Sequence, residues 1–326
     1  MKKIIFCLLL ASIYVVNTNS VFAQTNWNNL SPNEFIKTAT DIPQNAQNVT
    51  VDSVNISYVY KKMGDKKPLF YTGKTQFGIM FYATNTTQLG VSSSTITFET
   101  GKTKPKYLYQ MAVISDGQNI YFKPEQLKNK SLRNKWIKAN GSQYEKIGEG
   151  LGVSALFEVF STKSISEEKN STTKGVLAAT NSGLWQKYTD DIDDDITVPN
   201  TTRYNFEFKA SAIKPFFTEL TKTLTLDEAG YGLLTDKTFI KSLSNENVTQ
   251  FIADYSYISV WIDNTSKKPV KIVSATWIPI TEKNKTTYLL DYSETDFSKY
   301  DSAVKLNTPA NSVDAVTAAI QLKIKL

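Results

Sequence analysis

Paired carboxylates are the reaction chemistry that this sequence leaves open. The chain has no histidine and one cysteine among its 326 residues. A Ser-His-Asp or Cys-His arrangement therefore cannot form, and neither can a zinc site built from cysteine and histidine. Hydrolysis by a carboxylate pair stays open, with Glu99, Glu207 and Asp263 as candidates. The two carboxyl groups of such a pair must face one cleft and lie roughly 5–9.5 Å apart. Because no spacing indicates this, we predict a protein that is not an enzyme and has no catalytic residues.

The acidic run of residues 190–195 (DDIDDD) is the pattern that comes closest to a metal site. Three of its aspartates have the spacing of the first, third and fifth ligands of a calcium-binding loop. The sixth position is Ile196, where that loop needs glycine, and the twelfth is Thr202, where it needs glutamate. A solvated acidic loop is the better interpretation, so we predict no metal and no cofactor.

The N-terminal stretch MKKIIFCLLLASIYVVNTNSVFAQ has the order of a secretory signal peptide. Two lysines precede an apolar run from Ile4 to Val16, and the motif before Ala23 suits cleavage after that residue. The run is too short for a membrane span, which needs about 20 apolar residues. Cys7 lies inside the run and not at the cleavage point. We therefore predict a Sec signal peptide over 1–23 and an exported protein, periplasmic or extracellular, that is not lipid-anchored.

The charge of the chain excludes one class of partner. The formal net charge is +6, and removal of the two lysines of the signal leaves 6 − 2 = +4. The lysines are scattered and form no basic stripe with interleaved aromatic residues, so nucleic acid is a poor partner. This charge supports a weak contact with an anionic envelope surface and no more.

Most of the exported part reads as β-strand. Alternating or continuous apolar runs predict strands over 54–63, 75–84, 94–100, 106–115, 118–124, 202–210, 255–264, 269–280 and 286–297. Asp116 and Gly117 between two of these runs indicate a hairpin. The last three runs should form an antiparallel meander.

Four stretches read as helices, and they should cover the sheet. These are residues 26–42, with Ser31 as cap and Pro32 in the first turn, and residues 144–162, 211–224 and 237–252. Residues 163–175 read as a loop and residues 183–200 as irregular. No linker or repeat divides the chain, so we predict one domain over 24–326.

Two of these elements are more apolar than a strand or a helix that buries only one face needs to be. The run 76–83 is apolar on both faces, and the helix 211–224 carries an apolar stripe that is typical of packing into a core. A curved sheet with helices in its concavity can also leave an apolar cleft. The sequence keeps both interpretations open.

Two stretches, residues 260–277 and 297–310, carry short motifs of aromatic, aspartate and proline residues, Trp261-Ile262-Asp263 in the first and Phe297-Ser298 in the second. Both resemble elements of the LolA/LppX/LprG-like lipoprotein carrier superfamily. The first, VWIDNTSKKPVKIVSATW (260–277), is similar to its strand-turn-strand element through Trp261-Ile262-Asp263 and Pro269-Val270. The second, FSKYDSAVKLNTPA (297–310), resembles its closing strand. The positions that fill that pattern are Phe297, Ser298, Tyr300, Val304 and Pro309. Many members carry a lipidated cysteine at the cleavage point, which this chain lacks.

The resemblance implies an α+β fold: a strongly curved antiparallel β-sheet, an open half-barrel, with helices packed in the concave face. It implies acyl chains of a lipid or lipoprotein between sheet and helices, and residues 291–312 as an edge strand and exit segment. The apolar side chains expected to line such a space are Ile79, Phe81, Phe157, Phe160, Phe216, Phe217 and Leu220.

Two functions follow as hypotheses. The first is an exported binding protein for a hydrophobic ligand, with a lipid or acylated lipoprotein as partner and a monomeric state. The alternative is an envelope interaction or sensory domain of the same fold, with a fully packed interior and no ligand.

Overall fold

The structure is a computed structural model. It describes residues 25–46, 48–84, 88–101, 105–116, 118–125, 127, 129–151, 175–188, 196–223, 237–282, 285–302 and 307–326. The predicted signal peptide, the acidic run 190–195 and the second half of the predicted helix 144–162 lie outside these residues. No helix in this part of the chain is long and apolar enough to cross a membrane.

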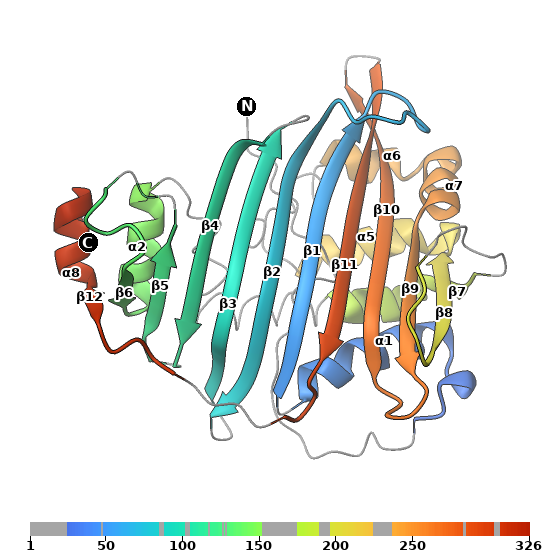
Figure 1. Ribbon diagram of the computed structural model, residues 1–326. Coiled ribbons are helices and arrows are strands. Elements are labelled where there is room, and N and C mark those ends of the chain that lie inside the picture. The colour runs from blue at the N-terminus through green and yellow to red at the C-terminus, as the bar shows by residue number, and fades with distance from the viewer. Residues whose placement is uncertain are drawn as a thin grey trace.

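The strands form one 12-stranded sheet in the order β12-β6-β5-β4-β3-β2-β1-β11-β10-β9-β8-β7. Their bounds are β1 Asn48–Tyr60, β2 Phe70–Thr84, β3 Gln88–Gly101, β4 Pro105–Ser115, β5 Ile120–Pro124, β6 Trp136–Ala139, β7 Trp185–Lys187, β8 Thr201–Phe208, β9 Tyr257–Asp263, β10 Pro269–Glu282, β11 Lys285–Ser298 and β12 Ser312–Asp314. Neighbouring strands are antiparallel except β12 and β6, which pair in parallel. The sheet is open, because β12 and β7 stand at its two ends (Figure 1).

The helices are α1 Pro32–Asn45, α2 Gly141–Leu151, α5 Ala210–Thr223, α6 Lys237–Ser242, α7 Glu246–Tyr255 and α8 Ala315–Leu322, with a short 3-10 helix at Trp27–Asn29. Residues 175–182 are also helical. In Figure 1, α1, α5, α6 and α7 lie behind the half of the sheet that runs from β1 to β8. The prediction of an antiparallel sheet with helices is therefore confirmed at the level of an α+β fold.

Helix α1 begins where the sequence predicts. The Ser31 hydroxyl accepts from the Glu34 amide, and the Glu34 carboxylate accepts from the Ser31 amide, which together form a capping box. The helix then packs Phe35 against the sheet, with ring centroids 4.9 Å from Phe206 of β8 and 4.6 Å from Trp27. This contact fixes which face of β8 and β9 is covered by helices.

The closing strand is not at an edge of the sheet. The sequence predicts residues 291–312 as an edge strand and exit segment, but β11 lies between β1 and β10. That prediction is wrong because the strand pairs with β1, more than 230 residues earlier, as in Ser57 with Asp291. After β11 the chain continues to β12 and α8 at the far edge, which the sequence analysis also missed.

Two further differences concern short elements. The predicted helix 237–252 is two helices, because residues 243–245 form a turn and Asn245 caps α7 through the Asn247 amide. The segment 183–200, predicted as irregular, contains the three-residue strand β7. Trp185 holds this strand in place by stacking edge-on against Phe208 at 4.8 Å.

Candidate functional site

The helix-covered face of β1 is apolar at its ends and polar in its middle. The buried residues on this face are Val49 and Val51 at one end, Val59 at the other, and Ser53, Asn55 and Ser57 between them, while Ile56 is buried on the opposite face. Each of these six side chains is between 1% and 8% exposed. The centre of the strand therefore places small polar groups where a core normally has apolar ones.

Strand β11 repeats this pattern beside β1. Its buried positions run from Leu289 through Asp291, Ser293 and Thr295 to Phe297. The register places Asp291 opposite Ser57, Ser293 opposite Asn55 and Thr295 opposite Ser53. On the other side of β11, Ser274 of β10 is opposite Ser293. We call this group the polar patch: Ser53, Asn55, Ser57, Ser274, Asp291, Ser293 and Thr295.

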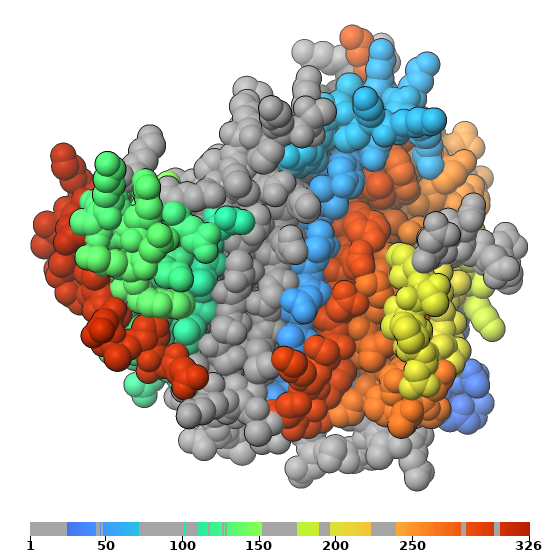
Figure 2. All heavy atoms as spheres, in the orientation of Figure 1, coloured from blue at the N-terminus to red at the C-terminus, as the bar shows by residue number. Residues whose placement is uncertain are grey.

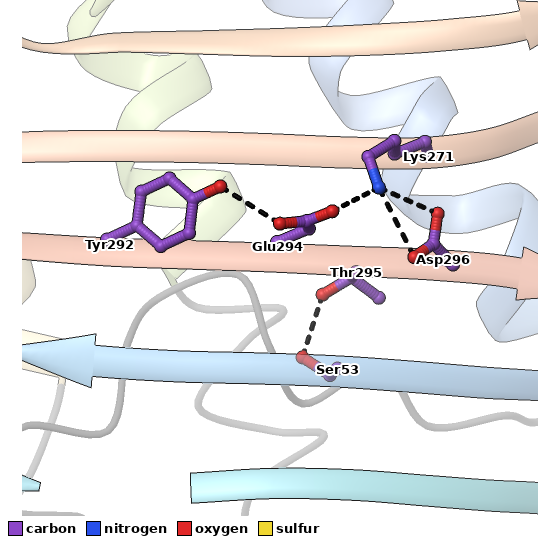
Figure 3. A network of polar contacts seen from close by, with 6 residues as sticks. All are labelled: Ser53, Lys271, Tyr292, Glu294, Thr295 and Asp296. Atoms are coloured by element: carbon purple, nitrogen blue, oxygen red, sulfur yellow. Dashed lines mark hydrogen bonds and ion pairs between the residues drawn. The ribbon is translucent and has the colours of Figure 1, made fainter. Parts of the chain in front are cut away.

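Part of the polar patch is internally hydrogen-bonded. The hydroxyls of Ser53 and Thr295 are 2.9 Å apart, a contact that Figure 3 shows between the two strands. The Ser57 hydroxyl donates to Asp291 Oδ1 at 3.0 Å. Asn55 donates through Nδ2 to Ser53 at 3.4 Å. These bonds fix the orientation of the polar side chains.

Three buried atoms of the polar patch have no hydrogen-bond partner among the described residues: Asn55 Oδ1, Ser274 Oγ and Asp291 Oδ2. A buried polar atom without a partner costs about 1–3 kcal/mol. Proteins therefore keep such atoms where water, an ion or a ligand satisfies them. All three atoms lie on the helix-covered face of β1, β10 and β11, within the polar patch.

Asp291 has no positively charged neighbour in the polar patch. Complete burial raises the pKa of its carboxyl well above the ordinary value, and the bond from Ser57 opposes this only in part. The carboxyl is therefore held in its neutral form into a pH range where an exposed aspartate is ionised. In that form it can donate a hydrogen bond as well as accept one.

The lining residues predicted from the sequence fall into three groups. Phe216, Phe217 and Leu220 of α5 are 3%, 2% and 0% exposed. Phe217 packs edge-on against Phe216 at 5.0 Å and against Phe239 of α6 at 5.2 Å. For Ile79 and Phe81 the structure describes only the backbone of β2, where they pair with Val51 and Val49. Phe157 and Phe160 lie outside the described residues.

The two described carboxylates of the hydrolase hypothesis do not face one cleft. Glu207 pairs with Tyr257, and Asp263 with Thr201, at opposite ends of the β8–β9 pair. Six residues of strand separate them, roughly 20 Å. Asp263 accepts from the amides of Thr265 and Ser266 in the following turn, so its role there is to hold the turn. The Glu99 side chain lies outside the described residues.

The opposite face of β10 and β11 carries charged groups. The Lys271 ammonium contacts Glu294, and Asp296 at 3.0 Å, and the Tyr292 hydroxyl donates to Glu294 at 3.0 Å. Figure 3 shows this network on the other side of the strands from Ser53 and Thr295. Burial opposes protonation of Lys271, but its hydrogen bonds to the two carboxylates outweigh this and raise its pKa. Among the described residues no group of three potential metal ligands occurs.

Sequence reasoning missed the polar patch, although its signal is visible. The alternating apolar residues of 54–63 predict the strand itself, but they do not reveal that the structure buries Asn55 and Ser57 together with Ile56. Small polar residues recur at every second position in DSVNIS and again in LDYSETDF. Two such runs paired in a sheet place a polar patch on one face.

These features define a class: an α+β protein whose open, mainly antiparallel sheet is covered on one face by helices and is polar at the centre of that face. No protein-family model and no curated protein sequence matches this chain. A solved structure titled "Lipid-protein interactions in lipovitellin" is similar at 8% identity and a TM-score of 0.29. The match covers 82% of this chain and 26% of that one, so the chain spans about a quarter of it. Likeness at this level assigns no family, and the resemblance to the LolA/LppX/LprG-like superfamily stays a prediction.

Proposed function

We propose that this chain is an exported, non-enzymatic binding protein. It holds a hydrophobic ligand, a lipid or the acyl chains of a lipoprotein, between the sheet and its helices, and the sheet curves around it as an open half-barrel. The observation that carries the proposal is the polar patch, in which three buried atoms have no partner among the described residues. An amphiphile would satisfy these atoms with its polar end.

The chemistry of the polar patch favours an uncharged polar end. None of its seven residues is cationic, and the Asp291 carboxyl is held neutral by burial. Protonated Asp291 can donate to an ester carbonyl, while Asn55 Oδ1 can accept from a hydroxyl. A phosphate would instead meet a carboxyl and no compensating positive charge, which is unfavourable in a buried site.

Apolar residues of the same face suit the acyl part of such a ligand. Val49, Val51 and Phe297 continue the covered face at one end of the polar patch, and Val59 and Leu289 at the other. Each buried CH₂ group contributes about 0.8 kcal/mol. A chain of about 16 carbons would therefore bind by several kcal/mol after the ordering costs are subtracted.

The second candidate is an envelope interaction or sensory domain with a packed interior. It is favoured by α5, where Phe216, Phe217 and Leu220 are buried against neighbouring aromatic rings. In this case the polar patch would hold ordered water and the helices would stay on the sheet.

Competition against a fluorescent acyl-chain probe, cis-parinaric acid, tests the proposal. The purified protein should bind the probe, and a diacylglycerol should displace it at lower concentration than phosphatidic acid with the same acyl chains. Ser293→Leu, inside the polar patch, should remove this preference, and the control Ser298→Leu, at an exposed position of the same strand, should keep it. Absence of probe binding by a folded protein would favour the packed domain.

A further inference from the structure

The connection between the central strands β1 and β2 forms a basic tip where these two strands end. We define the lysine tip as residues 61–70. Lys61, Lys62, Lys66 and Lys67 are all exposed in it, and Asp65 is the only acidic residue, so its net charge is 4 − 1 = +3. The charge is therefore more concentrated here than the scattered lysines of the whole sequence indicate. In Figure 2 this segment projects at the upper end of the molecule in light blue.

The lysine tip is an ordered turn. Asp65 accepts from the Lys62 amide through its carboxylate at 2.9 Å, and its own amide donates to the Lys62 carbonyl at 3.3 Å. Gly64 supplies the positive φ of 80° that the reversal requires. The Leu69 amide then donates to the Val59 carbonyl at 2.7 Å, where the strand pair begins. The lysines are thus presented on a fixed loop.

Two large apolar side chains share this tip. Leu69 is 41% exposed and Phe70 is 43% exposed, and they follow directly after the lysines. Exposed apolar residues of this size next to cationic ones are typical of surfaces that enter the headgroup region of a bilayer. The lysine tip has this combination within ten residues.

Aromatic residues surround the base of the lysine tip. Tyr60 lies 6.1 Å from Tyr58 and 5.3 Å from Trp277 of β10, measured between ring centroids. On α7, Phe251 lies 5.4 Å from Tyr288 of β11, the residue that pairs with Tyr60, and 4.9 Å from Tyr255, which is 47% exposed. Tyrosine and tryptophan are enriched at the level of lipid headgroups because their rings are apolar and their polar atoms face water.

We propose that the lysine tip docks this protein on an anionic lipid bilayer, with the lysines at the headgroups, Leu69 and Phe70 inserted and the aromatic residues at the interface. Charge complementarity selects this partner, since four lysines on one loop attract the negative surface of such a membrane. The docking does not depend on a ligand in the interior.

Vesicle flotation tests the proposal with the purified protein. It should float with vesicles of phosphatidylcholine and phosphatidylglycerol, stay behind with phosphatidylcholine alone, and dissociate at high salt. Replacing the four tip lysines by glutamine should weaken binding roughly 100- to 1,000-fold, because each lysine contributes about 1 kcal/mol. Leu69→Ser with Phe70→Ser should weaken it at unchanged charge.

The matched control replaces four exposed lysines near the edge of the sheet formed by β6 and β12: Lys130, Lys135, Lys146 and Lys325. It changes the net charge equally and should keep most of the vesicle binding. Equal loss in both lysine variants would show a response to total charge and overturn the proposal. Failure of the unmodified protein to float with either vesicle would also overturn it.

Discussion

Ser57 of β1 and Asp291 of β11 face each other on the helix-covered side of the sheet, and the serine hydroxyl donates to Asp291 Oδ1 at 3.0 Å. The second carboxyl oxygen, Oδ2, has no hydrogen-bond partner among the described residues. A completely buried carboxyl that has one hydrogen bond and no cationic partner among the described residues is costly to the fold. Its presence at the centre of the polar patch is the main support for the binding function proposed above.

Asp291→Asn should stabilise the protein at neutral pH. Burial raises the pKa of Asp291 well above the 3.8 of an exposed aspartate. At a pH between the pKa of Asp291 in the unfolded state and its raised pKa in the folded state, the folded protein keeps the proton and the unfolded chain releases it. The free energy of unfolding therefore falls as pH rises. The neutral variant removes this dependence. Urea unfolding from pH 3 upward should give equal stabilities below about pH 4 and a growing advantage for the variant above it, by at most about 1.4 kcal/mol per pH unit.

One outcome of the same experiment would contradict this prediction. If wild-type protein and Asp291→Asn keep a constant difference in the free energy of unfolding across this pH range, Asp291 titrates normally and is not buried as a neutral group. Asp52, an exposed residue of β1, provides the control, because Asp52→Asn makes the same chemical change at the surface of the same strand and should change the free energy of unfolding by less than about 0.5 kcal/mol.

Lys271→Met should destabilise the protein by about 1–3 kcal/mol, since it leaves two carboxylates of β11 without their shared cation. The Lys271 side chain is 8% exposed, whereas Lys37, paired with Asp41 on α1, is 50% exposed. Lys37→Met should therefore cost less than about 0.5 kcal/mol. Similar costs for the two variants in chemical unfolding would show that the Lys271 network contributes no more than a surface pair.

The Lys271 network should also make the free energy of unfolding depend on pH in the acid range. Burial works against ionisation of Glu294, but its bonds from Lys271 and Tyr292 prevail and lower its pKa below 4.5. A group with a lowered folded pKa stabilises above the unfolded value, and this stabilisation is lost as pH falls through the folded one. The Glu294→Gln variant should lose this acid-dependent part. An unchanged acid limb in its unfolding profile would contradict the assignment.

Phe217→Ala should cost about 3–5 kcal/mol, because it removes a ring packed between Phe216 and Phe239. Phe70→Ala deletes the same atoms at an exposed position and should cost less than about 0.5 kcal/mol. Thermal unfolding followed by circular dichroism compares the two variants. A small cost at Phe217 would indicate that α5 leaves the sheet easily, as an adaptable cover over a ligand would.

The sequence predicts those parts of the fold that depend on neighbours along the chain. Examples are the capping box of α1, the Asp116 turn and the meander from β9 to β11. Each of them forms between residues or strands that are adjacent along the chain. Their signals are local, so one sequence is enough to find them.

The parts that failed depend on distant pairing. The place of β11 beside β1 is set by contacts more than 200 residues apart, and no local pattern contains them. The buried face of β1 was missed for a related reason. Ile56 looks like a core residue and is buried, but the sequence does not show that the covering helices bury Asn55 and Ser57 on the other face of the strand. The polar patch, on which the proposed function depends, therefore became visible only in the structure.

Native mass spectrometry of the protein, purified without detergent, tests the central claim most directly. We predict an adduct with the mass of an uncharged lipid that disappears after solvent extraction and returns when a diacylglycerol is added back. Ser293→Leu should carry less of this adduct than Ser298→Leu. An adduct-free mass that persists after incubation with diacylglycerol and with envelope lipids would contradict the binding function and leave a protein with a packed interior.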